Sequence, residues 1–327
     1  MEFKKLSLTM TNQYALGIDI GGTSIEFGIV NEKGDVVINK DFPTKQFSTP
    51  ESLVDEIFDA IKDLQEFDSI VGIGIGAPNG NYFTGHIEYA PNLSWKGIVP
   101  LKQLFEAKFD LPTLLTNDAN AAAMGEMVFG NAKDLKDFVT ITLGTGVGSG
   151  VVVNGQLVYG HDGFAGEYGH IRVIPNGRKC GCQRLGCLET YCSSTGVVRS
   201  IQELDSENKP FSALSSLEQP SAKDVFELAE EGDLFAEEIV EYTAQILGSS
   251  LADYACFSSP KAYVLFGGIA QHKGDFAHRV KKYLEENILI VYKNKIDIRI
   301  SSLHDKNAAV LGTAAHVFWD LLQLKIK

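Results

Sequence analysis

The chain has 327 residues, of which 44% are hydrophobic, and its formal net charge is −13 at pH 7. This length is typical of about two domains with their own cores, and the acidic balance disfavours nucleic acid as a partner because phosphates are repelled. No stretch of about 18 uncharged apolar residues is present, and the leading segment MEFKKLSLTMTNQY lacks the apolar core and cleavage site of a signal peptide. We therefore expect a cytoplasmic protein whose five cysteines are reduced.

Short apolar runs and one amphipathic stretch define the elements of the first half. Asn31 to Gly34 is the turn of a hairpin, and Thr49 followed by Pro50 is the expected start of a helix whose apolar residues recur on one face. The strands expected here are residues 15–20, 25–30, 35–39, 70–75 and 111–115. An Ala-rich helix is expected directly after the last strand.

The second half of the sequence begins with the same order of predicted elements as the first half. ITLGTGVGSGVVVNGQLV (141–158) repeats the strand, glycine turn, strand, hairpin and strand of IDIGGTSIEFGIVNEKGDVV (18–37). The Asn154-Gly155 pair is a strong hairpin signal. We interpret the repeat as two related α/β lobes, with two unrelated hairpins as the alternative.

Further elements of the second half alternate between strands and helices, which predicts mostly parallel sheets covered by helices. The expected strands are residues 138–143, 148–153, 156–159, 262–265 and 296–300. The expected helices are residues 222–232, 234–254 and 308–324. Residues 200–222 are rich in Ser, Glu, Lys and Pro, and we expect them to form an exposed excursion.

Glycine turns follow three of the predicted strands. Gly21-Gly22-Thr23 and the turn from Gly144 to Gly148 would let backbone N–H groups approach phosphate oxygens. Neither turn has the P-loop pattern, and neither opens into a helix as a dinucleotide fingerprint does. Each is either part of a phosphate site or a bare hairpin. Gly267-Gly268 would let a flat ring or a ribose lie against the backbone, or is an ordinary strand-to-helix turn.

A polar cluster, Thr116-Asn117-Asp118-Ala119-Asn120, lies where the strand 111–115 ends and the Ala-rich helix begins. Ligands of α/β proteins bind at the carboxyl ends of strands. Asp118 could accept a proton from an attacking hydroxyl, the role of the base in phosphoryl transfer. The alternative is that Asp118 or Asn117 only caps the helix.

Thiol and imidazole groups gather between residues 170 and 192. Cys180, Cys182 and Cys187 lie close in sequence with His170 and Cys192, and such ligands suit tetrahedral zinc. Spacing leaves the fourth ligand open between Cys192 and His170. A site closed by four protein ligands would hold a structural zinc, whereas the alternative is a set of buried free thiols.

Together these residues resemble the ROK family of sugar kinases and repressors, from Leu16 to about Gly312. The motifs that carry the resemblance, in chain order, are IDIGGTSIEFGIV, GIGAPNG, APNLSW, TNDANAAAMGE, LGTGVGSG, and GHDGFAGEYGHIRV followed by CGCQRLGCLETYCSS. The resemblance implies an α/β protein with the actin-like ATPase (ribonuclease H-like) fold, in two lobes with a central cleft. The implied smaller lobe is residues 1–118 plus about 308–327, and the larger lobe, with the zinc site, is residues 119–307.

The activity implied is an ATP-dependent hexose kinase that transfers the γ-phosphoryl group to the 6-hydroxyl of a sugar in glycolysis. Glucose is the first expectation, and an N-acetylglucosamine or N-acetylmannosamine kinase is the alternative. A transcriptional regulator is more remote, since few residues precede the strand at Ala15, and so is a non-catalytic sugar sensor. The resemblance also implies ATP with Mg²⁺, a structural Zn²⁺, and a homodimer or homotetramer without nucleic-acid or membrane partners.

Roles of single residues follow from the resemblance by position. Asp118 matches the catalytic base. Matches to sugar-binding positions are Gly80, Asn92, Asn117, Asp118, Glu167, His170 and Glu189. Matches to positions around ATP are Asp19, Gly21, Gly22, Thr23, Ser24, Gly144, Thr145, Gly146, Gly148, Gly267 and Gly268. Matches to the zinc ligands are His170, Cys180, Cys182 and Cys187, which assigns Cys192 to the core. The chain departs from the family at Ser24, where Lys is common, and at Gln183, where Gly is usual.

Overall fold

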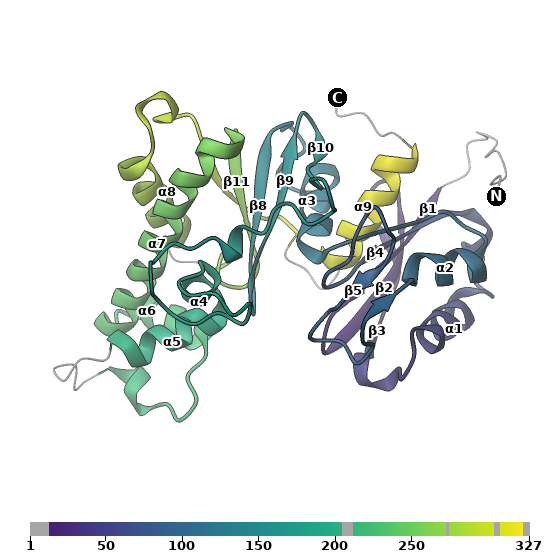
Figure 1. Ribbon diagram of the computed structural model, residues 1–327, viewed down its shortest axis with the longest axis horizontal. Helices are drawn as coiled ribbons and strands as arrows, with labels where there is room; N and C mark the ends of the chain where they lie inside the picture. The colour runs from purple at the N-terminus through teal and green to yellow at the C-terminus, as the bar shows by residue number, and fades with distance from the viewer. Residues whose placement is uncertain (1–12, 205–211, 273–274, 304–307, 323–327) are drawn as a thin grey trace. The chain divides into compact units, whose positions relative to one another are not determined.

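The computed structural model describes residues 13–204, 212–272, 275–303 and 308–322, and the chain divides into two compact units (Figure 1). Unit 1 comprises Met1–Asp134, Leu157–Ala165 and Asp305–Lys327, and unit 2 comprises Leu135–Gln156 and Gly166–His304. The lobe boundaries expected from the sequence stay a prediction. Most of the leading segment, and residues 323–324 of the predicted last helix, lie outside the described residues.

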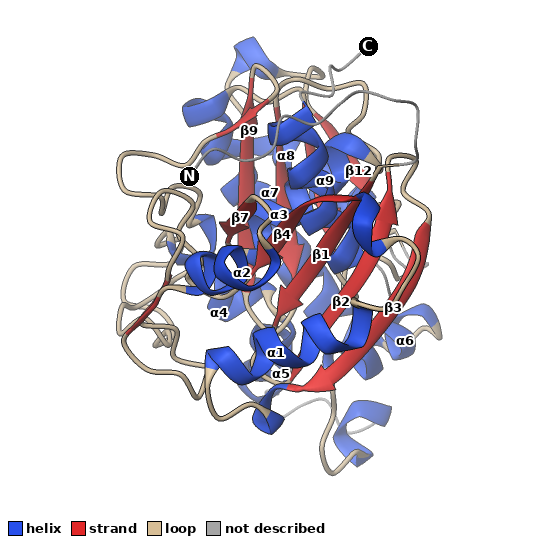
Figure 2. Ribbon diagram, turned by 90° about the vertical axis from the view of Figure 1, so that its right-hand side faces the viewer, coloured by secondary structure: helices blue, strands red, loops and turns tan. Residues whose placement is uncertain are grey.

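A five-stranded sheet with the order β3-β2-β1-β4-β7 forms the centre of unit 1 (Figure 2). Its strands are β1 (Tyr14–Ile20), β2 (Ser24–Asn31), β3 (Val36–Pro43), β4 (Ile70–Gly76) and β7 (Thr113–Thr116). β1 pairs antiparallel with β2 and parallel with β4, and β4 pairs parallel with β7. All five strands were predicted. A small separate sheet pairs β5 (Ile87–Glu88) with β6 (Ile98–Val99).

Helices cover both faces of this sheet. They are α1 (Pro50–Ile61), α2 (Leu101–Phe109), α3 (Asp118–Val128) and α9 (Ala308–Leu322). α1 begins as predicted, since the Thr49 hydroxyl accepts the Ser52 N–H at 3.2 Å. α1 and α2 share one hydrophobic cluster with alternate residues of β1, and α9 packs on the other face of β1 and β4.

Close backbone contact sets the position of α9 on the sheet. A Cβ atom at Gly74 in β4 would lie 1.9 Å from the carbonyl oxygen of Thr313 in α9. Only glycine permits this approach. The glycines of β4 therefore bring the C-terminal helix against the strands.

Unit 2 repeats the sheet of unit 1, with the order β10-β9-β8-β11-β12. Its strands are β8 (Phe138–Leu143), β9 (Val147–Val153), β10 (Gln156–Leu157), β11 (Ala262–Phe266) and β12 (Asp297–Ile300). The first two strands are again antiparallel, and β11 is parallel to β8 and β12. The predicted duplication is confirmed, and it is the repeat that the actin-like ATPase fold requires. β10 is shorter than predicted, since it ends at Leu157.

Five helices described in unit 2 are α4 (Glu189–Cys192), α5 (Ser194–Leu204), α6 (Ala222–Glu230), α7 (Leu234–Ser258) and α8 (Phe276–Asn287). The excursion predicted for residues 200–222 is wrong at its start, because residues 200–204 belong to α5 and Ser200 and Ile201 are buried. The later residues 205–211 lie outside the described part. No helix was predicted at α8, whose buried residues Phe276, Val280 and Leu284 recur every fourth position in a charged sequence. Among the described residues, no helix combines the length and apolarity needed to span a membrane.

Candidate functional site

Two predicted site residues in unit 1 are carboxylates at the ends of sheet strands. Asp19 is the penultimate residue of β1, and Asp118 follows β7 as the first residue of α3. Burial, together with the negative charges of Asp118 and Glu26, raises the pKa of Asp19 to about 7. The protein atoms around Asp118 raise its pKa as well, although its side chain is exposed and one oxygen accepts the Ala119 N–H at 2.9 Å.

Asn117, rather than Asp118, caps helix α3. Its side-chain oxygen accepts the Asn120 N–H at 2.7 Å. The sequence left open whether Asn117 or Asp118 caps the helix, and this contact assigns the cap to Asn117. The second carboxylate oxygen of Asp118 is not needed for the cap. The amide NH₂ of Asn117 is the part of its side chain that remains for a ligand.

The first glycine turn lies between β1 and β2 and is held by Thr44. The Thr44 hydroxyl donates to the Gly21 carbonyl at 2.7 Å, and the Thr44 N–H donates to the Thr23 carbonyl at 3.0 Å. Gly22, Thr23 and Ser24 are exposed. A turn whose backbone is exposed and whose conformation is fixed by hydrogen bonds to Thr44 is suited to binding an anion.

Two further predicted residues of unit 1 lie beside these elements. A Cβ atom at Gly22 would meet the Cβ of Asn92 at 3.1 Å, so Asn92 borders the glycine turn. A Cβ atom at Gly80 would lie 2.4 Å from the Thr116 carbonyl oxygen, directly before Asn117. Unit 1 thus brings Asn92 to the turn and Gly80 to the segment that carries Asp118.

Glycine turns of unit 2 lie at the ends of two neighbouring parallel strands. The turn Gly144–Gly146 follows β8, and Gly267 follows β11. A Cβ atom at Gly267 would lie 2.5 Å from the carbonyl oxygen of Leu143, whereas one at Gly144 or Gly268 would meet nothing within 4 Å. The two turns therefore lie side by side with open space beside their backbone. Gly148, also a predicted residue, lies in β9.

The segment that carries Glu167 and His170 lies against β9. A Cβ atom at Gly169 would lie 1.9 Å from the Val147 carbonyl oxygen. The Tyr168 N–H donates to the Ser149 hydroxyl at 3.2 Å, and the Tyr254 hydroxyl donates to the Tyr168 carbonyl at 3.1 Å. These contacts fix the backbone between the two predicted sugar ligands.

Predicted zinc ligands meet in one cluster. The ligand atoms of His170, Cys180, Cys182 and Cys187 all lie within 4.8 Å of one another. The Cys182 and Cys187 sulfurs are 3.7 Å apart, and the Cys180 sulfur lies 3.6 Å from Nδ1 of His170. Zn–S bonds of about 2.3 Å in a tetrahedron place two sulfurs about 3.8 Å apart, so the donor set fits zinc.

Cys192 lies outside this cluster, as expected. It is fully buried, and its thiol lies 3.7 Å from the Thr243 carbonyl oxygen in α7. Burial raises the pKa of this thiol, which keeps it neutral.

Arg178 supports the cluster and was not identified from the sequence. Its guanidinium is buried, donates to the carbonyl oxygens of Thr190 and Gly196 at 2.7 and 2.9 Å, and pairs with Glu203 at 2.8 Å. Its carbon Cζ lies 4.4 Å from the centre of the Tyr191 ring. An arginine between a glycine and a lysine has no sequence signature, so only the fold reveals that it joins the cysteine segment to α5.

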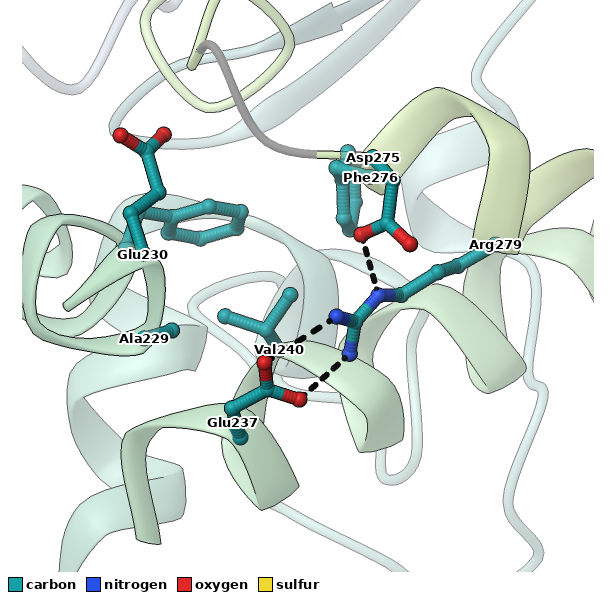
Figure 3. A pocket seen from close by; sticks show the side chains of 8 residues that line it. Ala229, Glu230, Glu237, Val240, Asp275, Phe276 and Arg279 are labelled. Carbon is teal, nitrogen blue, oxygen red and sulfur yellow. Dashed lines mark hydrogen bonds and ion pairs between the residues drawn. The ribbon is translucent and has the colours of Figure 1, made fainter. Parts of the chain in front are cut away.

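Pockets elsewhere in unit 2 contain none of the predicted site residues. One, of about 280 Å³, lies among α6, α7 and α8, where Arg279 pairs with Asp275 at 2.6 Å and with Glu237 at 3.2 Å (Figure 3). Another, of about 340 Å³, lies between residues 171–174 and α7. The carboxylates of Glu230, Glu237 and Asp275 line the first pocket together with the Arg279 guanidinium.

Comparisons with known proteins agree with these motifs. The model of the ROK family matches residues 15–318. A glucokinase from Halalkalibacterium halodurans is 36% identical over 93% of this chain and 94% of its own length, and one from Streptomyces coelicolor is 37% identical over 80% and 83%. The crystal structure of a ROK family glucokinase from Streptomyces griseus in complex with glucose and AMPPNP is 32% identical, with a TM-score of 0.75 over 92% of this chain and 98% of that one.

Proposed function

The chain belongs to the ROK family, and from this premise we propose that it is an ATP-dependent hexose kinase that phosphorylates the 6-hydroxyl of glucose. The single observation that carries the proposal is the pair of carboxylates, Asp19 and Asp118, at the ends of β1 and β7, the two strands that flank β4 in unit 1, with raised pKa values. Support comes from relatives described as glucokinases. N-acetylglucosamine and N-acetylmannosamine kinases remain the alternatives.

Asp118 is the proposed catalytic base. As the sugar oxygen bonds to the γ-phosphorus, the carboxylate accepts the hydroxyl proton, the bond from phosphorus to the β–γ bridging oxygen breaks, and ADP leaves with the electron pair. A raised pKa makes Asp118 a stronger base than an aspartate with the ordinary pKa. The cap at Asn117 keeps the start of α3, and hence this carboxylate, in place.

Asp19 is the proposed partner of the divalent cation. Its carboxylate fits Mg²⁺, because hard carboxylate oxygens are the preferred ligands and a cation would offset the burial and the repulsion that raise its pKa. When bound with ATP, Mg²⁺ supplies positive charge that offsets the charge developing on the transferred phosphoryl group. The backbone of the turns at Gly21–Ser24 and Gly144–Gly148 would bind phosphate oxygens, with Gly267 and Gly268 beside adenosine.

Residues with proposed sugar-binding roles occur in each unit. In unit 1, Gly80, Asn92 and Asn117 accompany Asp118. In unit 2, Glu167, His170 and Glu189 would bind hydroxyl groups, each at a set angle. With Nδ1 of His170 beside the Cys180 sulfur, its Nε2 is the nitrogen left for a sugar hydroxyl.

His170, Cys180, Cys182 and Cys187 would hold the zinc. With four protein ligands the site is closed, so the metal fixes the fold of the segment and takes no part in the chemistry. Between its first and last ligands the described chain forms no helix or strand, and pairs only in the isolated bridges Arg172–Cys187 and Lys179–Leu185, so a metal is an effective crosslink there. We also propose a homodimer or homotetramer in the cytoplasm, where ATP is available and thiols stay reduced.

ADP release with MgATP, measured across glucose, mannose, fructose, N-acetylglucosamine and N-acetylmannosamine, tests the function. We expect glucose to exceed the other sugars. Asp118→Asn should lower kcat by at least about a hundredfold while sparing glucose binding, since the amide cannot accept the proton. Equal loss of turnover and sugar affinity in this variant would contradict the role of base, and no turnover with any sugar would contradict the kinase.

A further inference from the structure

The turn Gly144–Thr145 is attached to the beginning of helix α5. The Ser194 N–H donates to the Gly144 carbonyl at 2.8 Å. The Thr195 hydroxyl donates to the Thr145 carbonyl at 3.1 Å. Two successive carbonyl groups of the turn therefore point toward α5.

The orientation of the Thr195 hydroxyl is itself constrained. Oγ of Ser193 lies 2.9 Å from Oγ1 of Thr195. The Ser193 hydroxyl in turn contacts the Glu189 carbonyl at 2.6 Å and accepts the Gly196 N–H at 3.0 Å. A short chain of hydroxyl groups thus connects the turn to the backbone of α4.

The far end of the turn is attached to the same segment through the Glu189 side chain. Its Oε2 accepts the Val147 N–H at 3.1 Å, and a Cβ atom at Gly146 would lie 2.5 Å from that oxygen. Its Oε1 lies 3.5 Å from the Cys180 sulfur. The turn is therefore held at both ends by residues that directly follow the cysteine cluster.

Planarity of the peptide bond gives this attachment a chemical consequence. In a trans peptide the C=O and the next N–H point in opposite directions. Because the carbonyls of Gly144 and Thr145 point toward α5, the N–H groups of Thr145 and Gly146 point away from it. Thr145 is exposed and Gly146 is partly exposed, so an anion can reach both donors.

We propose that Thr195 is a positioning residue for the nucleotide, which keeps the Thr145 and Gly146 N–H groups directed at its phosphates. The inference rests on the proposed assignment of this turn to ATP. Thr195 touches no reacting atom and acts only through the turn. Its loss should therefore weaken nucleotide binding and leave hexose binding unchanged.

Thr195→Val and Thr195→Ser, in the full-length zinc-loaded protein, test the proposal. MgATP affinity is measured by calorimetry without sugar, alongside the KM values for ATP and hexose. Removing one hydrogen bond predicts roughly three- to tenfold weaker MgATP binding in Thr195→Val, with the same rise in the KM for ATP. Thr195→Ser keeps the hydroxyl and should bind like the wild type. The matched control is Thr243→Val, whose hydroxyl donates to the Ile239 carbonyl at 2.9 Å inside α7.

Unchanged MgATP affinity in Thr195→Val would overturn the proposal, and so would equal weakening in Thr195→Val and Thr195→Ser, which indicates a packing effect. Thr195→Ala is a second variant without the hydroxyl, and it must weaken MgATP binding too. Zinc content and thermal unfolding test whether each variant is folded. Wild-type protein that binds no MgATP would overturn the assignment of the turn and this role together. If MgATP binding is intact and depends on Thr195 but no hexose is turned over, the result would contradict only the proposed kinase activity and would support the role of Thr195.

Discussion

Replacing Asp19 by Asn should make the protein more stable at alkaline pH while lowering its activity. The pKa of this carboxyl is raised to about 7 in the folded chain, against 3.8 for its ordinary value. A carboxyl whose folded pKa is raised binds more protons in the folded state, so stability is lost as pH rises between these two values. At 1.36 kcal/mol per pKa unit, the charged Asp19 costs about 4 kcal/mol above about pH 8.

Urea unfolding of the wild type and Asp19→Asn, from about pH 5.5 to about pH 8.5, measures this cost. Since only part of the pKa interval lies in that range, the stability advantage of Asp19→Asn should grow by about 2 kcal/mol. Mg²⁺ should stabilise the wild type at the alkaline end and have little effect on the variant, because the cation offsets the same charge. Asp59→Asn is the control, since Asp59 is exposed on α1 and is paired with Lys62. A pH-independent difference between the wild type and Asp19→Asn would refute the reasoning.

Two further predictions concern packing and the metal. Cys182→Ser should lose the zinc and lower the free energy of unfolding by several kcal/mol, because the cluster then lacks one ligand. Metal analysis measures the zinc content, and urea unfolding measures the free energy. Full zinc content in the variant would contradict the ligand set. Gly74→Ala should destabilise unit 1 by about 3 kcal/mol, since the new Cβ would lie 1.9 Å from the Thr313 carbonyl oxygen in α9. Thermal unfolding measures this loss, and Ser52→Ala, at a partly exposed position in the first turn of α1, is the control. A Gly74→Ala protein as stable as the wild type would mean that α9 moves freely on the sheet.

Local sequence patterns were sufficient for most strands and for the repeat. Apolar runs ending at glycine turns predicted β1, β4, β8 and β11, because a buried strand needs little beyond continuous apolar residues and a turn. Helix α8 was missed, since only Phe276, Val280 and Leu284 face the core and its other positions are mostly charged or polar. Residues 200–204 were misassigned because Ser200 reads as a loop residue until Arg178 and Gly196 are seen beside it.

Reading the chain in order was enough to identify the chemical groups of this protein and their sequence: glycine turns after strands, an aspartate at a strand end, and clustered thiols with one histidine. Patterns of this type are local, and they survive in any fold that keeps the chain order. Which of these groups meet depends on the folded chain. It places Asp19 near enough to Asp118 for their charges to interact, brings His170 rather than Cys192 to the three cysteines, and attaches Gly144 and Thr145 to α5. These contacts join residues distant in the chain, and they depend on strand order and close backbone packing, which spacing in a sequence does not encode.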